Sequence, residues 1–154
     1  MLSAQGLATL EAVMKRYPTK QAAIRPLFHL VQKEHGYISA KAEEWIASKL
    51  DLPPVKVHEV MTFYTMLHAE PVGRHHLQLC RTLPCMLRGS ERLLAHLKGK
   101  LGLIAGERTA DGRFSLQEVE CLAACGNAPC IQVNDDYHMD VTVEKLDRLL
   151  DSLK

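Results

Sequence analysis

Five cysteines gather in the second half of the chain. All lie between positions 80 and 130, and the first half holds none. Cys80 and Cys85 form a C-x4-C pair, Cys121 and Cys125 form a C-x3-C pair, and 35 residues lie between the two pairs. In a chain expected to stay in a reducing compartment, such clustering indicates metal ligation or catalysis before disulfides.

Two close pairs of this kind are suited to hold a metal centre through four thiolates. Each pair follows a segment expected to be a strand, and loops that leave the same end of a sheet can bring four sulfur atoms together. Thiolates favour iron-sulfur clusters or zinc. Structural zinc most often uses C-x2-C pairs, whereas a wider pair can reach around one iron of a binuclear cluster while the second pair holds the other iron. The spacing therefore favours an iron-sulfur cluster and leaves zinc open.

Other roles for the cysteines explain the pattern less well. Burial as small apolar residues accounts for single cysteines, not for two close pairs on expected loops. A dithiol oxidoreductase is disfavoured because the sequence contains no C-x-x-C motif. Cys130 follows Pro129 and opens an expected core strand. We therefore expect Cys130 to be a buried packing residue and not a ligand.

The surroundings of a four-thiolate centre should carry hydrogen-bond donors or cations. Thiolates and cluster core together leave a net negative charge that grows on reduction, and such groups stabilise it. The candidates are the Thr82 side chain, the backbone N–H groups of Gly126 and Asn127, and the arginines Arg81 and Arg88. We predict that the Arg81→Ala substitution lowers the midpoint potential of the centre.

The first half of the sequence has the apolar periodicity of four short helices. Apolar residues recur there at three- and four-residue steps. Ser39 has the position of an N-cap for the third helix, and Pro26 should kink or delay the start of the second. The stretches are separated by Pro18, Gly36 and Pro53–Pro54. This pattern predicts a small helical bundle over residues 1–70.

After residue 70 the apolar period changes to that of strands. Residues 75–80 and 114–121 alternate like half-buried strands, and residues 131–133 and 137–141 form an expected hairpin. Thr142 can cap a final helix. An expected helical face lies between the first two strands, at Leu87, Leu93, Leu94, Leu97 and Leu101. The order β-α-β-β-β-α, or β-α-β-β-α with one strand merged, predicts a small α/β domain resembling thioredoxin over residues 71–154, and an α+β chain as a whole.

Composition and motifs exclude several classes of function. Lys and Arg number 19 against 18 Asp and Glu, so no basic excess favours nucleic acid. No stretch approaches the ~18 consecutive apolar residues of a membrane helix. The N-terminus lacks the features of a signal peptide, so we expect a cytoplasmic protein without direct membrane insertion. Without G-x-G-x-x-G or a phosphate loop, any nucleotide or flavin is expected on another chain, and no catalytic residue is assigned.

Across essentially its whole length the sequence resembles the E-subunit family of NADH-quinone oxidoreductase (respiratory complex I). The segments that carry the resemblance are AIRPL from Ala23, QKEHGYI from Gln32, VMTFY from Val60, CRTLPCMLRGSE from Cys80, DGRFSLQEVECLAACGNAP from Asp111 and IQVNDDYH from Ile131. The sequence departs from that family at Ala123, where glycine is common, and at Cys130, where an apolar residue is usual.

The resemblance implies a helical bundle followed by a thioredoxin-like ferredoxin fold with one 2Fe-2S cluster. Its implied ligands are Cys80, Cys85, Cys121 and Cys125. The implied role is that of a non-catalytic electron-transfer subunit, which exchanges electrons with the FMN of a partner subunit that oxidises NADH. The two would form a heterodimer, and through it the chain would contact the remaining peripheral-arm subunits. It would then lie on the cytoplasmic side of the inner membrane through the complex.

Two alternatives stay open. The sequence is also similar to the gamma chain of NAD-dependent formate dehydrogenases and to the diaphorase part of NAD-linked hydrogenases, although its CMLRGSE and CLAACGNAP segments are more similar to respiratory members. A different class is a zinc-stabilised interaction module without a redox role, which would be colourless and would unfold with chelators.

Overall fold

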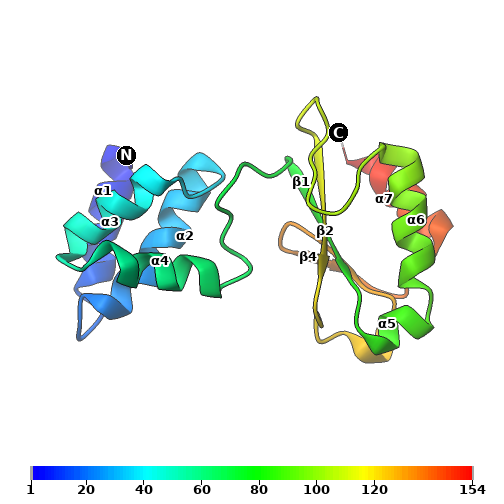
Figure 1. The fold of residues 1–154 in the computed structure, drawn as a ribbon, viewed down its shortest axis with the longest axis horizontal. Coiled ribbons are helices and arrows are strands. Elements are labelled where there is room, and N and C mark those ends of the chain that lie inside the picture. Colours follow the sequence, from blue (N-terminus) through cyan, green and yellow to red (C-terminus); the bar gives the residue numbers. More distant parts are fainter. Residues whose placement is uncertain (1, 154) are drawn as a thin grey trace. The chain divides into compact units, whose positions relative to one another are not determined.

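The chain divides into two compact units, Met1–Pro71 and Val72–Lys154 (Figure 1). The computed structural model describes residues 2–153. The first unit consists of helices, and the second combines helices with a mixed sheet. The α+β class predicted from the sequence is therefore confirmed. None of the helices within residues 2–153 combines the length and the apolar character needed to cross a bilayer.

Four α-helices and one 3-10 turn make up the first unit. Their bounds are α1 Ala4–Met14, η1 Gln21–Ala23, α2 Ile24–His35, α3 Ala40–Leu50 and α4 Pro54–Phe63. The helices surround one apolar core, in which the fully buried side chains include Ile24, Leu27, Phe28, Ile46 and Leu50. The helical bundle predicted for this part of the chain is therefore present.

Local signals at the helix ends explain most of the boundaries. The Ser39 hydroxyl accepts a hydrogen bond from the Ala42 N–H, as predicted for an N-cap (3.3 Å). Gly36 ends α2 with a φ of 80°, a conformation that glycine adopts without a steric penalty. The delay expected at Pro26 is not found, because α2 begins at Ile24. Pro26 lies in the first turn, where a backbone N–H has no partner inside the helix and its loss costs little.

The second unit is built on a four-stranded sheet of order β2-β1-β3-β4. Its elements are β1 His75–Cys80, α5 Leu83–Leu87, α6 Ser90–Leu101, β2 Phe114–Val119, η2 Cys125–Asn127, β3 Ile131–Val133, β4 Asp136–His138 and α7 Val143–Ser152. β1 and β2 are parallel, whereas β3 is antiparallel to both β1 and β4. Helices α6 and α7 cover one face of the sheet (Figure 1). Their core contains Leu77, Leu79, Leu97, Leu116, Ile131 and Leu146.

The element order agrees with the longer of the two predicted orders, with one difference in the first helix. The expected helical face from Leu87 to Leu101 is divided between α5 and α6, because the chain turns at Gly89 with a φ of 99°. Leu87 therefore does not join the core, and 74% of its surface is exposed. The break leaves α5 as a separate short helix at the edge of the sheet where β1 ends.

Candidate metal centre

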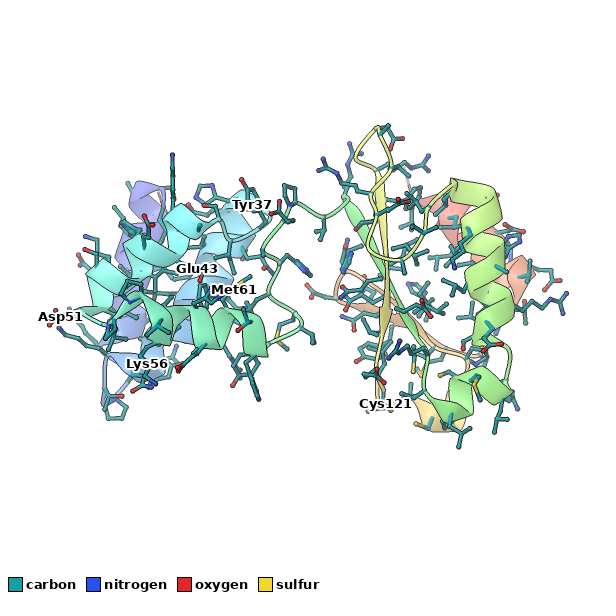
Figure 2. The ribbon with its side chains drawn as sticks, viewed as in Figure 1. Tyr37, Glu43, Asp51, Lys56, Met61 and Cys121 are labelled. Carbon is teal, nitrogen blue, oxygen red and sulfur yellow. The ribbon has the colours of Figure 1, made fainter. Side chains whose placement is uncertain are left out.

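Three strand ends bring three of the five cysteines to one edge of the sheet. β1 and β2 run in parallel register, with Cys80 opposite Val119, so both strands end at this edge. Cys80 is the last residue of β1, and Cys121 follows two residues after β2 (Figure 2). β3 runs the other way, so Cys130, directly before it, lies beside Cys80. The Cys80 N–H donates to the Cys130 carbonyl over 3.2 Å.

Two short helical segments supply the other two cysteines. Cys85 lies in α5, which begins three residues after β1 ends, and Cys125 is the first residue of η2. The sulfur atoms of Cys121 and Cys125 are 3.5 Å apart. Cys80 and Cys85 are 1% exposed, whereas Cys121 and Cys125 are exposed. All four cysteines that the sequence singled out therefore reach one end of the second unit, as one buried and one exposed pair.

The charge of each cysteine pair affects the pKa values of the other pair. Burial raises the pKa of the Cys85 thiol, and negative charge on Cys80 and Cys125 adds to the rise. A hydrogen bond with Cys121 and burial raise the pKa of Cys125, and negative charge on Cys121 and Cys80 contributes further. Each pair thus opposes ionisation in the other, which is the behaviour of sulfur atoms gathered at one place.

Two of the thiols have a lowered pKa because hydrogen bonds stabilise their thiolates. Burial alone would raise the pKa of Cys80, but hydrogen bonds with Thr82 and with the Leu122 backbone outweigh it. At Cys121 the main cause of the lowered pKa is the hydrogen bond from the Ala123 N–H to the sulfur (3.3 Å). Each pair therefore contains one thiol with a lowered pKa and one with a raised pKa.

Cys130 is buried against the centre. Its side chain is 1% exposed and packs with Cys80, Cys85 and Ala128. Burial raises the pKa of its thiol to about 11, and negative charge on Cys85 adds to the effect. Its backbone forms a hydrogen bond with the Cys85 sulfur. This burial agrees with the packing role expected from the sequence.

Only some of the groups expected to surround the centre contact its sulfur atoms in the structure. The Thr82 hydroxyl oxygen lies 3.2 Å from the Cys80 sulfur, as expected. Arg81 instead forms an ion pair with Glu120 (2.9 Å). The Asn127 N–H donates to the Ala124 carbonyl (3.0 Å), so this expected sulfur donor is used within η2.

Arg88 and the side chain of Asn127 meet at Asp140. The Arg88 guanidinium lies 3.9 Å from one carboxylate oxygen of Asp140, and the Asn127 amide donates to the other over 3.0 Å. The Asp140 N–H also donates to the Asn127 carbonyl (2.8 Å). These contacts fasten the loop after Cys125 to the end of α5.

One sulfur donor was missed from the sequence, namely the Ala123 N–H. Ala123 has a φ of 59°, in the left-handed region that residues with a Cβ rarely occupy. This conformation accompanies the hydrogen bond from its N–H to the Cys121 sulfur. The sequence did hold one indication of this conformation, because Ala123 stands where the family that the sequence resembles commonly has glycine.

The donor set fits a 2Fe-2S cluster. It offers four soft sulfur ligands in two pairs, and an N–H and an O–H group lie at hydrogen-bonding distance from them. Among residues 2–153, no three Cys, His, Asp or Glu side chains converge on a point that suits a single metal ion. The four sulfur ligands are thus arranged as one buried and one exposed pair.

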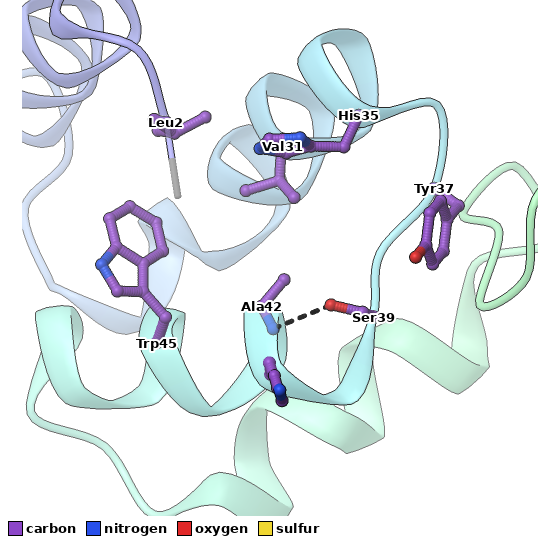
Figure 3. A pocket seen from close by; sticks show the side chains of 8 residues that line it. Leu2, Val31, His35, Tyr37, Ser39, Ala42 and Trp45 are labelled. Atoms are coloured by element: carbon purple, nitrogen blue, oxygen red, sulfur yellow. Dashed lines mark hydrogen bonds between the residues drawn. The ribbon is translucent and has the colours of Figure 1, made fainter.

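The helical unit has a pocket of its own, of about 370 Å³. Leu2, Val31 and Trp45 provide its apolar lining (Figure 3). Lys41 contributes a cation. The Ser39 hydroxyl in this pocket already caps α3. The pocket contains none of the cysteines.

Comparison with known proteins places the chain in one family. Residues 10–154 match the model of the thioredoxin-like [2Fe-2S] ferredoxins. The chain belongs to this family, and the predicted thioredoxin-like fold is confirmed.

Two curated relatives are similar over almost their whole length. The chain is 49% identical to the E 2 subunit of NADH-quinone oxidoreductase from Rhizobium meliloti (strain 1021), over 94% of this chain and 86% of the relative. It is 44% identical to the E subunit of NADH-quinone oxidoreductase from Rickettsia bellii (strain RML369-C), over 97% of this chain and 92% of the relative. These relatives are components of an oxidoreductase.

A solved structure supports the fold at lower sequence identity. The crystal structure of an NAD+-reducing [NiFe]-hydrogenase in the H2-reduced state contains a chain that matches 82% of this one with a TM-score of 0.72 and 20% identity. This chain spans only about a fifth of the hydrogenase chain (22%). The likeness therefore concerns the fold alone.

Proposed function

We propose that this chain is an electron-transfer subunit of an NADH-quinone oxidoreductase and that its four paired cysteines hold a 2Fe-2S cluster. The proposed ligands are Cys80, Cys85, Cys121 and Cys125. The observation that carries the proposal is the 3.5 Å distance between the sulfur atoms of Cys121 and Cys125, at the sheet edge to which β1 and α5 bring the other pair.

The family and the pairing of the sulfurs favour two irons over one zinc ion. A structural zinc site closes four ligands around a single ion, whereas the family that residues 10–154 match is one of [2Fe-2S] ferredoxins. In a 2Fe-2S cluster each iron takes two protein sulfurs. The buried pair would serve one iron and the exposed pair the other.

The residues around the sulfurs can adjust the charge of the centre. The cluster, when bound, supplies a site that accepts and releases single electrons. The Thr82 hydroxyl and the Ala123 N–H stabilise negative charge on Cys80 and Cys121 respectively. Because Cys121 and Cys125 are exposed, electrons would enter and leave on their side.

The proposed electron partner is the subunit that binds NADH and FMN. This chain carries no motif for binding either, and its relatives at 41–49% identity are named as subunits of NADH-quinone oxidoreductase. Two leucines of α5 on either side of Cys85, Leu83 and Leu87, are 61% and 74% exposed. They offer apolar contact area beside the cluster for this partner.

In this proposal the chain works in the cytoplasm and reaches the membrane through the other subunits. We also propose that residues 1–70 and 71–154 are two domains with separate tasks. The second would carry the electron site, and the first would extend the surface for other subunits. The two apolar cores, one in each unit, support this division.

The ligand assignment can be tested with single Cys→Ser variants of the anaerobically purified chain. Serine at each of the four proposed ligands should reduce the iron content or change the EPR spectrum of the reduced protein. Cys130→Ala is the matched control and should keep both iron content and spectrum. A wild-type spectrum in any of the four variants would contradict the assignment of that cysteine.

The partner can be tested by adding NADH to the purified chain. Alone, the chain should stay oxidised, because it has no expected site for NADH. With the flavin subunit of its own complex added, the visible absorption of the cluster should bleach. Reduction by NADH in the absence of that subunit would contradict the non-catalytic role.

A further inference from the structure

The two cysteine pairs differ in their access to solvent. Cys121 and Cys125 are exposed at the end of the second unit, where Figure 2 labels Cys121. The remaining three cysteines, Cys80, Cys85 and Cys130, are each 1% exposed. A thiol reagent in solution would therefore meet only one of the pairs in the folded chain.

The exposed pair is also held at a distance from which a disulfide can close. Its sulfur atoms lie 3.5 Å apart, and a disulfide bond is about 2.0 Å long, so they must approach by about 1.5 Å. Their separation along the chain is short, and the η2 turn begins at Cys125 itself. Neither cysteine lies in a strand, so this movement does not require a change in the sheet.

We propose that Cys121 and Cys125 form a site of thiol-disulfide exchange with low-molecular-weight disulfides, such as oxidised glutathione, in the chain before it receives a cluster. One thiolate of the pair attacks a glutathione sulfur, which forms a mixed disulfide and releases one glutathione thiolate. The second cysteine thiolate then attacks the mixed disulfide and releases the other glutathione. The pair loses two protons and two electrons, and one glutathione disulfide becomes two glutathione molecules.

The consequence for cluster loading rests on the proposed function. If Cys121 and Cys125 are ligands, their disulfide removes one of the two sulfur pairs, and the chain can take up iron only after reduction. The buried pair keeps its thiols throughout. The site would then couple cluster loading to the thiol-disulfide balance of the cell.

The full chain carrying Cys130→Ala gives the clearest test, because the fifth thiol is then absent. Iron is removed with a chelator under anaerobic reducing conditions, the chain is desalted, and oxidised glutathione is added. Trypsin separates Cys80 from Cys85 by cleavage after Arg81 and leaves Cys121 and Cys125 on one peptide. We expect that peptide to lose two hydrogen atoms in mass, while Cys80 and Cys85 remain open to alkylation after denaturation.

Three results would overturn the proposal. They are a stable glutathione adduct on Cys121 or Cys125, a disulfide that includes Cys80 or Cys85, and complete alkylation of all four cysteines. The same reaction in denaturant is the control, and it should give mixed pairings. A folded chain with that mixed pattern would likewise show that the native geometry does not select the pair.

The outcome can be separated from failure of the proposed function, because mass detects the disulfide without iron. Iron and sulfide are then added to the oxidised chain before and after reduction by a dithiol. If the disulfide forms but the reduced chain takes up no cluster, the proposed function is contradicted and the exchange site is still supported. A cluster in the reduced chain without disulfide formation would do the reverse.

Discussion

The hydroxyl oxygen of Thr82 lies 3.2 Å from the sulfur of Cys80, although Thr82 occupies the N-cap position of α5. Within residues 2–153 this hydroxyl makes no capping hydrogen bond, so its contact is with the sulfur. A hydrogen bond to a cluster ligand favours the reduced, more negative state. The threonine hydroxyl is thus placed to stabilise charge on the Cys80 sulfur and does not cap α5.

Replacing Thr82 by valine should lower the midpoint potential of the cluster. The variant keeps the side-chain shape and loses the hydroxyl. We expect a shift on the order of 50 mV, which corresponds to a factor of roughly ten in a one-electron equilibrium. Thr82→Ser is the matched control, since it keeps the hydroxyl and should stay near the wild-type value. A redox titration followed by EPR measures both, and equal potentials for valine and wild type would refute the role.

The ion pair between Arg81 and Glu120 should act on the potential in two opposite directions. Arg81→Ala removes a cation next to Cys80 and should lower the potential, whereas Glu120→Gln removes the anion that offsets it and should raise the potential. Both side chains are more than half exposed, so solvent screening limits each shift to roughly 10–40 mV. Lys98→Ala, two turns into α6, is the control cation and should change nothing measurable. Shifts of the same sign would contradict this account.

Glycine at position 123 should stabilise the loaded protein. Ala123 has a φ of 59°, which costs an L-residue roughly 1–2 kcal/mol, while the greater freedom of glycine in the unfolded chain offsets part of the gain. We expect Ala123→Gly to raise the unfolding free energy by about 0.5–1 kcal/mol in denaturant titrations.

The neighbouring alanine supplies a control for this prediction. Ala124 has a φ of −104°, which alanine adopts easily, so Ala124→Gly should destabilise the protein by a similar amount. If both substitutions change the unfolding free energy by the same amount and with the same sign, the left-handed conformation of Ala123 does not limit stability.

The two units should respond separately to the loss of buried side chains. Leu27 and Leu97 are 0% exposed, in the cores of the first and second units respectively. Substitution of either by alanine should cost about 2–5 kcal/mol. Hydrogen exchange in the full chain should show increased opening in the unit that carries the change. Only Leu97→Ala should also speed loss of the cluster. Equal loss of protection in both units for each variant would contradict two separate domains.

Much of the fold follows from local sequence signals. The alternation of residues 75–80 matches β1 to the residue, and Ser39 and Thr142 both cap the helices predicted to follow them. Two features depended on tertiary context instead. Pro26 could be placed in a first turn only once α2 was seen to begin at Ile24, and the Gly89 turn that separates α5 from α6 interrupts a periodic pattern that reads as continuous.

At the centre, the sequence pointed to the cysteines better than to their surroundings. Spacing grouped the two pairs, and the strand pattern explained why both should reach one edge. The donors were harder to predict because they depend on backbone conformation. The Asn127 N–H is used by the Ala124 carbonyl, whereas the Ala123 N–H reaches sulfur from a conformation that alanine does not favour.

Most of these predictions depend on one 2Fe-2S cluster held by four cysteines of this chain. The most direct test is to count iron and zinc in the anaerobically purified full chain and to record its EPR spectrum before and after reduction with dithionite. We expect about two irons per chain, visible sulfur-to-iron absorption and a low-temperature signal that appears on reduction. About one zinc per chain, with no colour and no signal even after iron and sulfide are supplied under reducing conditions, would contradict it.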